Sequence, residues 1–286
     1  MATAQAPIQG NYHGYYLKRP ARDDPRIALL PPSLLTGATV LDVGCNEGWV
    51  TCEIGQKHGA SRVVGVDIDE SLVSAAWRHR RTTWSFQAPE NDSTSVNNSL
   101  GKRKRAFPAP RVADYFPASC EHLFGPIPVP PAELRGRGIF PHNVSFRAAD
   151  WVADAIPEDA EGYDVVLALS VSKWIHLNSG DDGLLSFFRK VHSVLRAGGT
   201  FVLEAQPWDS YHKAKRMDKR LKEVGQTLKL RPDNFASILR GIGFGEVQHF
   251  GAAGSAGASQ SHISPLLFST HPYSGFRRPV DAYVKL

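Results

Sequence analysis

The stretch Val40-Leu41-Asp42-Val43-Gly44-Cys45-Asn46-Glu47-Gly48 decides the fold of this 286-residue chain. It reads as a buried strand over 39–43, a glycine turn, and a helix over 47–57. A second strand, over 62–67, ends at Asp67. Glycine lets the backbone turn tightly and approach a ligand, so this arrangement predicts a nucleotide-binding α/β unit.

The rest of the chain continues the alternation of strands and helices. Further strands are expected at 144–148, 163–169, 200–204, 245–250 and 280–285. Further helices are expected at 71–80, 184–196 and 233–240. The second of these helices is predicted to stop at Gly198-Gly199. We therefore predict an α/β fold with a mostly parallel seven-stranded sheet, covered on both faces, and an antiparallel C-terminal hairpin.

Two stretches do not fit this alternation. Residues 85–140 are rich in Pro, Asn, Ser and Arg, and we expect a flexible insertion there. Residues 251–261 form a Gly-, Ala- and Ser-rich loop inside the terminal hairpin. Neither stretch indicates a second folded domain, so we predict a single domain over 1–286. Residues 1–30 are expected to form a segment that closes over the bound molecules.

The composition is that of a soluble globular protein, with 42% hydrophobic and 21% charged residues. No apolar run reaches the ~18 residues of a membrane span, and residues 1–10 lack the apolar stretch of a signal peptide. Cys45, Cys52 and Cys120 are too few and too scattered for a disulfide framework or a zinc cluster. We therefore expect no membrane, no metal and a reducing compartment, with Cys45 a small turn residue and not a nucleophile.

Basic residues are concentrated in two places. Six of them, against the single Asp218, lie between Tyr211 and Lys222, which we call the basic stretch. It is either a solvated helix face or a surface for an anionic partner. The run Lys102–Arg105 is either a polar loop or a nuclear-import signal.

Dinucleotides and S-adenosylmethionine are the two cofactors that use such a glycine turn. Asp67 follows at a spacing that suits hydrogen bonds from ribose hydroxyls. Dinucleotide sites prefer Gly-x-Gly-x-x-Gly, but Asn46 occupies the second glycine position and Asp42 places a negative charge before the turn. That charge would repel a pyrophosphate and not a cationic sulfonium, which favours S-adenosylmethionine. Asp150-Trp151 suits the adenine, although Trp151 fits core packing equally well.

The methyl acceptor is read from the segments after strands 163–169 and 200–204, because ligands of open α/β sheets lie beyond the carboxyl ends of the strands. These segments are 170–178 and 204–211. They contain neither an Asn-Pro-Pro-Tyr pattern nor a Pro-Cys pair, so methylation of a base amine or of a cytosine carbon is not expected. They contain a lysine and aromatic residues and lead into the basic stretch.

In these segments the chain resembles the methylphosphate capping enzymes, the bicoid-interacting-protein family of class I S-adenosylmethionine-dependent RNA methyltransferases. The resemblance is carried by residues 11–16 with Arg19 and Arg26, and by 41–48, 67–69, 169–178, 203–208 and 275–280. Ser-x-x-Lys-Trp-x-His-Leu-Asn and Glu-x-Gln-Pro-Trp are its most specific patterns. The resemblance implies a Rossmann-like class I methyltransferase fold. It also implies methyl transfer to the 5′ γ-phosphate of a small noncoding RNA made by polymerase III, with S-adenosylhomocysteine as product.

By position, the resemblance also implies the roles of single residues. The cofactor would be lined by Tyr16, Arg26, Gly44, Cys45, Asn46, Asp67, Ile68, Asp150, Trp151 and Leu169, to which Asp42 is added for its charge. The RNA end would be held by Tyr15, Arg19, Lys173, Tyr211, Lys215, Phe276 and Arg277. Trp208 is a further RNA candidate that, like Trp174, either stacks on a nucleotide or caps the sheet.

Lys173, Tyr15 and Arg19 are the expected catalytic residues, and they act by orienting the phosphate. An ionised phosphate oxygen needs no general base, so His176 is expected to be a structural hydrogen-bonding residue. Asp150-Trp151 departs from the more usual Asn-Tyr of the family.

The resemblance further implies a nuclear, monomeric protein that works with a La-related RNA-binding protein. Two rival interpretations remain. One is a methyltransferase for a 5′-monophosphate RNA or a small anionic metabolite, and the basic stretch disfavours the metabolite. The other is an RNA-binding scaffold with weak or no catalysis, which the intact glycine turn and Asp67 disfavour.

Overall fold

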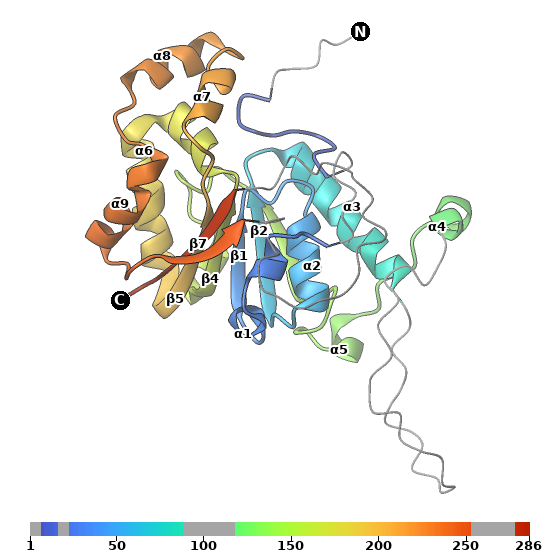
Figure 1. The fold of residues 1–286 in the computed structure, drawn as a ribbon. Coiled ribbons are helices and arrows are strands. Elements are labelled where there is room, and N and C mark those ends of the chain that lie inside the picture. Colours follow the sequence, from blue (N-terminus) through green and yellow to red (C-terminus); the bar gives the residue numbers. More distant parts are fainter. Residues whose placement is uncertain (1–6, 17–22, 88–117, 253–277) are drawn as a thin grey trace, which may run out of the picture.

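The computed structural model describes residues 7–16, 23–87, 118–252 and 278–286. Its centre is a seven-stranded sheet in the order β3-β2-β1-β4-β5-β7-β6. The strands are β1 Thr39–Val43, β2 Arg62–Asp67, β3 Val144–Ala148, β4 Tyr163–Leu169, β5 Leu195–Glu204, β6 Gln248–Ala252 and β7 Pro279–Val284. β1 to β5 are parallel, and β7 pairs antiparallel with both β5 and β6 (Figure 1). The predicted α/β fold with an antiparallel C-terminal hairpin is confirmed.

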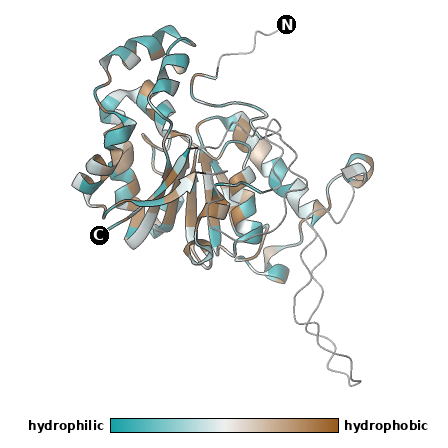
Figure 2. Ribbon diagram, in the orientation of Figure 1, coloured by the Kyte–Doolittle hydropathy of each residue, from teal (hydrophilic) through white to brown (hydrophobic). Residues whose placement is uncertain are grey.

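Helices cover both faces of the sheet. The α-helices are α1 Pro32–Leu35, α2 Trp49–Lys57, α3 Glu70–Phe86, α4 Ala118–Phe124, α5 Ala132–Arg135, α6 Ser172–Val194, α7 Asp209–Ala214, α8 Lys219–Thr227 and α9 Phe235–Ile242. Successive strand residues point to opposite faces, so Val40 packs in one core with α2 and α3, and Leu41 packs in the other with α6 and α9. Figure 2 shows hydrophobic residues on the strands and hydrophilic ones along α8. Within the described residues, no helix is both long and apolar enough to span a membrane.

Helix α6 begins earlier than the sequence pattern predicts. The expected start was residue 184, whereas the helix spans Ser172–Val194 with a non-helical Gly180 (φ 69°, ψ −170°) between its two parts. The first part carries Trp174 and forms, with α7 and α8, a third apolar cluster. Gly198-Gly199 lie inside β5 and do not end the helix. As a consequence, α7 and α8 pack against residues 172–178, the first part of α6, at the carboxyl end of the sheet.

Part of the predicted insertion is folded. Helix α3 continues to Phe86, and residues 118–140 contain α4 and α5. The Ile127 N–H donates to the Ser85 hydroxyl at 2.8 Å, and the Trp84 indole donates to the Pro128 carbonyl at 3.3 Å. These contacts fix the segment against the end of α3. Residues 88–117, and 253–261 of the expected hairpin loop, lie outside the described residues.

Candidate active site

The turn after β1 is shaped by residues with positive φ. Gly44 has φ +74°, and an added Cβ would lie 2.9 Å from a methyl group of Val171. The Gly44 N–H donates to the Val66 carbonyl at 2.8 Å, and the Asn46 N–H donates to the Asp67 carboxylate at 2.9 Å. The turn therefore ties β1 to β2 and leaves no room for a side chain at position 44.

Residues 7–16, which we call the N-terminal strap, cross from α6 to this turn. The Asn178 amide donates to the Ile8 carbonyl at 2.9 Å, and the Asn46 amide donates to the Tyr12 carbonyl at 3.1 Å. In Figure 1 the strap lies at the same end of the sheet as α7 and α8. That this segment closes over the bound molecules stays a prediction.

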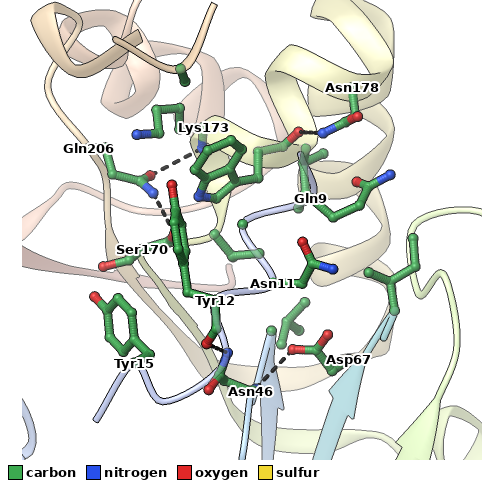
Figure 3. A pocket seen from close by; sticks show the side chains of 18 of the residues that line it. Gln9, Asn11, Tyr12, Tyr15, Asn46, Asp67, Ser170, Lys173, Asn178 and Gln206 are labelled. Atoms are coloured by element: carbon green, nitrogen blue, oxygen red, sulfur yellow. Dashed lines mark hydrogen bonds between the residues drawn. The ribbon is translucent and has the colours of Figure 1, made fainter. Parts of the chain in front are cut away.

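A cavity of about 770 Å³ lies under the strap, at the carboxyl ends of the strands. It brings together ten of the predicted site residues: Tyr15, Tyr16, Gly44, Asn46, Asp67, Ile68, Asp150, Trp151, Leu169 and Lys173. Figure 3 shows Asp67 and Asn46 at one end of the view and Lys173 and Gln206 at the other, with Tyr12 between them. We call the end with Asp67 and Asn46 the donor half, for the methyl donor, and the end with Lys173 and Gln206 the acceptor half, for the methyl acceptor.

The side chains that line the donor half are mainly groups that accept hydrogen bonds. Burial raises the pKa of Asp67, which accepts from the backbone N–H groups of Asn46 and Asp69. The side-chain oxygens of Asn11 and Asn46 are buried and find no hydrogen-bond donor among the described residues. Unsatisfied acceptors beside a carboxylate fit the ammonium and ribose hydroxyl groups of S-adenosylmethionine.

Trp151 packs in the core and also lines the cavity, and its contact with the adenine stays a prediction. It lines the cavity and also packs edge-on against Phe187 in the core. Its indole nitrogen donates to both carboxylate oxygens of Asp159 at 3.1 Å. The ring thus offers the cavity an apolar wall, while its polar nitrogen is used elsewhere.

The acceptor half is cationic. Lys173 lies there, with Arg278 and Lys213 near enough to affect its pKa, and Arg216 and Arg220 also line the cavity. Burial, followed by repulsion from Arg278 and Lys213, lowers the pKa of Lys173 to about 8. Two carboxylates, Asp67 and Asp150, are the acidic residues of the lining, and both are predicted cofactor residues. The cavity therefore combines an acceptor-rich half with a half suited to a polyanion.

Three predicted cofactor residues do not line the cavity. Asp42 is buried and accepts from the Thr51 hydroxyl at 2.6 Å, and burial raises its pKa to about 6. Arg26 is 1% exposed and donates to Asp24 and Glu204, both at 2.7 Å. Cys45 is also buried, with a thiol pKa well above its usual range because of desolvation. Their side chains face the protein interior, so they stabilise the wall of the cavity and do not contact what binds in it.

Three of the predicted RNA-binding residues lie outside the cavity lining. Tyr211 is fully buried, and its hydroxyl lies 3.2 Å from His176 Nδ1. Trp208 stacks on Tyr211 at 4.6 Å between centroids, and the Arg231 guanidinium lies 3.5 Å from its ring centroid. Groups this close must occupy opposite faces of the indole, so a nucleotide has no free face. Lys215 donates to the Gly225 carbonyl, and none of the three predicted residues lines the cavity.

His176 matches its predicted structural role. It is 0% exposed, and its Nε2 lies 2.7 Å from Asp181 Oδ1. Arg19, Phe276 and Arg277 lie outside the described residues. The sequence reasoning overlooked Arg278, although it belongs to the Gly275–Val280 pattern, because two adjacent arginines cannot be told apart by spacing. The described residues hold no group of three or more His, Cys, Asp or Glu side chains that could bind a metal ion.

Comparisons with known proteins relate the chain to methyltransferases. A family model described as Bicoid-interacting protein 3 matches residues 163–285, and a methyltransferase-domain model matches residues 41–96. A magnesium protoporphyrin IX methyltransferase from Synechocystis, solved with bound SAM, is 15% identical with a TM-score of 0.45, and the match covers 90% of this chain and 75% of that one.

Two curated relatives are similar over most of the chain. The human 7SK snRNA methylphosphate capping enzyme is 35% identical over 96% of this chain, which spans 39% of the human protein. A probable RNA methyltransferase of Arabidopsis thaliana is 36% identical over 90% of this chain and 77% of its own length. The chain therefore belongs to the Bicoid-interacting protein 3 family.

Proposed function

We propose that the chain is an S-adenosylmethionine-dependent methyltransferase that methylates the 5′ γ-phosphate of a small RNA. The observation that carries this proposal is one cavity that has unsatisfied hydrogen-bond acceptors beside Asp67, Lys173 at its other end, and five cations in its lining. A cationic donor and a polyanionic acceptor suit these two halves. The names of the human and Arabidopsis relatives support the same reaction class.

The residues of the donor half fit the cofactor. Asp67 would accept hydrogen bonds from the ribose hydroxyls, Asn11 and Asn46 would bind the ammonium group, and Asp150 with Trp151 would contact the adenine. S-adenosylmethionine supplies an electrophilic methyl group when bound. The chain's own contribution on this side is to orient the cofactor and to exclude water beneath the strap.

Lys173 and Arg278 act on the acceptor. Their charge-assisted hydrogen bonds would fix the terminal phosphate so that one oxygen faces the donor half. That oxygen is already ionised at neutral pH, so no side chain has to remove a proton. Catalysis then depends on alignment, which can contribute several kcal/mol. Tyr15 lines the same cavity and would limit the movement of the phosphate.

The number of cations favours a 5′-triphosphate over a monophosphate. Besides Lys173 and Arg278, the lining contains Lys213 on α7, Arg220 on α8 and Arg216 between these helices. A 5′-triphosphate would bring more negative charge to these side chains than a 5′-monophosphate. The basic stretch continues this surface along the RNA backbone.

The test is transfer of labelled methyl to matched RNAs with a 5′-triphosphate, a 5′-monophosphate or a 5′-hydroxyl. We expect label on the triphosphate RNA, at the γ-phosphate, protected from phosphatase. Preference for the monophosphate would correct the substrate, and RNA binding without transfer would instead indicate a scaffold. We also propose a nuclear, monomeric protein that works with a La-related partner. Microscopy tests the nuclear location, light scattering the monomeric state, and co-purification the partner.

A further inference from the structure

Three segments far apart in the sequence meet on one buried carboxylate, that of Glu204. Glu204 is 0% exposed and ends β5. Its Oε2 accepts from Arg26 Nη1 at 2.7 Å and from the Ser170 hydroxyl at 2.5 Å. Its Oε1 accepts from Arg278 Nε at 3.0 Å. The segment after the strap, the loop after β4 and the start of β7 are thus joined through one side chain.

Ser170 completes the support of Arg278. Its hydroxyl accepts from Arg278 Nη2 at 2.8 Å, so the guanidinium is held at two points. Ser170 has φ +66°, a conformation that non-glycine residues keep only where the surroundings fix it, often at functional sites. The side-chain amide of Gln206 donates to the Ser170 carbonyl and contributes to this fixation. A planar guanidinium held at two points has little freedom to turn.

The residue two positions beyond Glu204 supports the other inner cation. Gln206 Oε1 accepts from the Lys173 backbone N–H at 3.1 Å. Lys173, Arg278 and Gln206 line the cavity, whereas Glu204 lies behind its wall.

Glu204 also separates two like charges. Arg26 and Arg278 both contact it, and without its carboxylate the two guanidiniums would repel each other. Arg26 keeps two bonds to Asp24, at 2.9 and 2.7 Å. Arg278, whose side chain is 21% exposed, lines the cavity. Loss of the Glu204 charge would therefore leave Arg26 paired with Asp24 and remove an acidic partner from Arg278.

We propose that Glu204 is a positioning residue for methyl transfer, because it holds the Arg278 guanidinium at the cavity wall where this group binds the acceptor phosphate. The identity of the acceptor rests on the proposed function. The role of Glu204 as an anchor for an anion-binding arginine does not depend on which anion binds.

A double-mutant cycle tests this coupling. Glu204→Gln and Arg278→Met should each lower kcat/KM for 5′-triphosphate RNA by about 10- to 100-fold, the effect of losing a charge-assisted contact. The double variant should be no slower than Arg278→Met alone, because Glu204 acts through Arg278. Multiplicative losses would overturn the proposal, since they would indicate a general structural effect.

Glu158→Gln is the matched control. Glu158 is also buried and accepts from Arg147 Nε and Nη2 at 2.9 and 2.7 Å, but it does not line the cavity. Its replacement should leave methyl transfer near the wild-type rate. If the Glu204→Gln protein does not fold, Ser170→Ala takes its place in the cycle, and the same loss of additivity with Arg278→Met is expected.

Calorimetric binding of inorganic tripolyphosphate to the full chain separates this inference from the proposed function. Affinity should fall about tenfold in each single variant and no further in the double variant. A wild-type protein with this coupling but no transfer to RNA would refute the proposed function and leave the role of Glu204 intact. An active wild type with independent losses would refute the role of Glu204 alone.

Discussion

Replacement of Lys173 by arginine should abolish the alkaline limb of the pH–rate profile. Burial and the neighbouring charges of Arg278 and Lys213 lower the pKa of Lys173 to about 8, so its ammonium is charged below that pH and neutral above it. The acceptor phosphate requires the charged form. Between about pH 7 and about pH 9 the charged fraction falls roughly tenfold, and kcat/KM should fall with it because this parameter reports the free enzyme.

An arginine at position 173 stays protonated throughout this range. The variant should therefore show a flat profile where the wild type declines, whatever its absolute rate. Initial rates on 5′-triphosphate RNA, from about pH 6.5 to about pH 9.5 at constant ionic strength, measure this difference. Lys57→Arg, on α2 and outside the cavity lining, is the control and should keep the wild-type decline. An unchanged decline in Lys173→Arg would refute the assignment of Lys173 to the acceptor.

Three further predictions concern the strap, the core and the salt response. At Gly10, which has φ +78°, the Cβ of Gly10→Ala would lie 2.3 Å from the Trp174 ring. The strap would have to move, so the KM for RNA should rise several-fold. The control is Gly125→Ala, also at φ +78° but with nothing within 4 Å of the added Cβ, which should not change KM. The raised pKa of Asp42, about 6 against 3.8, means that its contribution to stability falls as pH rises between these values, by about 3 kcal/mol. Asp42→Asn should flatten this dependence in urea titrations and retain S-adenosylhomocysteine affinity; a loss of affinity would return Asp42 to the cofactor site. If about four phosphates are contacted, a plot of log RNA affinity against log salt concentration should have a slope of roughly −3. A flat response would show that the basic stretch does not bind RNA phosphates.

The sheet and its glycine turn could be predicted because their signals are local. A β-branched run, a glycine and a helical pattern lie within residues 39–57, and each element forms where its own pattern predicts it. The start of α6 could not be predicted in this way. Gly180 and the polar residues around it interrupt the helical periodicity, and the part before it is stabilised by packing of Trp174 under α7 and α8.

The direction of side chains was the harder part of the site. Spacing placed Asp42 before the turn, but only the fold shows that its carboxylate faces Thr51 in the interior. Tyr211 stands in the basic stretch and nevertheless belongs to the apolar cluster under α7. Spacing could not distinguish Arg278 from the adjacent Arg277, and the partner that fixes its side chain, Glu204, is 74 positions away. Contacts between residues distant in sequence have no local signature.

The route by which the chain enters β3 has a consequence for how this fold can vary. Helix α3 begins just after the carboxyl end of β2 and runs back toward the amino ends of the strands, and α4 and α5 then lead into the neighbouring strand β3 (Figure 1). Length added between Phe86 and Ala118 is therefore attached away from the carboxyl ends of the strands, where the cavity lies. Evolution can lengthen, shorten or replace that connection, and even add a recruitment element to it, while the chemistry at the carboxyl ends remains as it is.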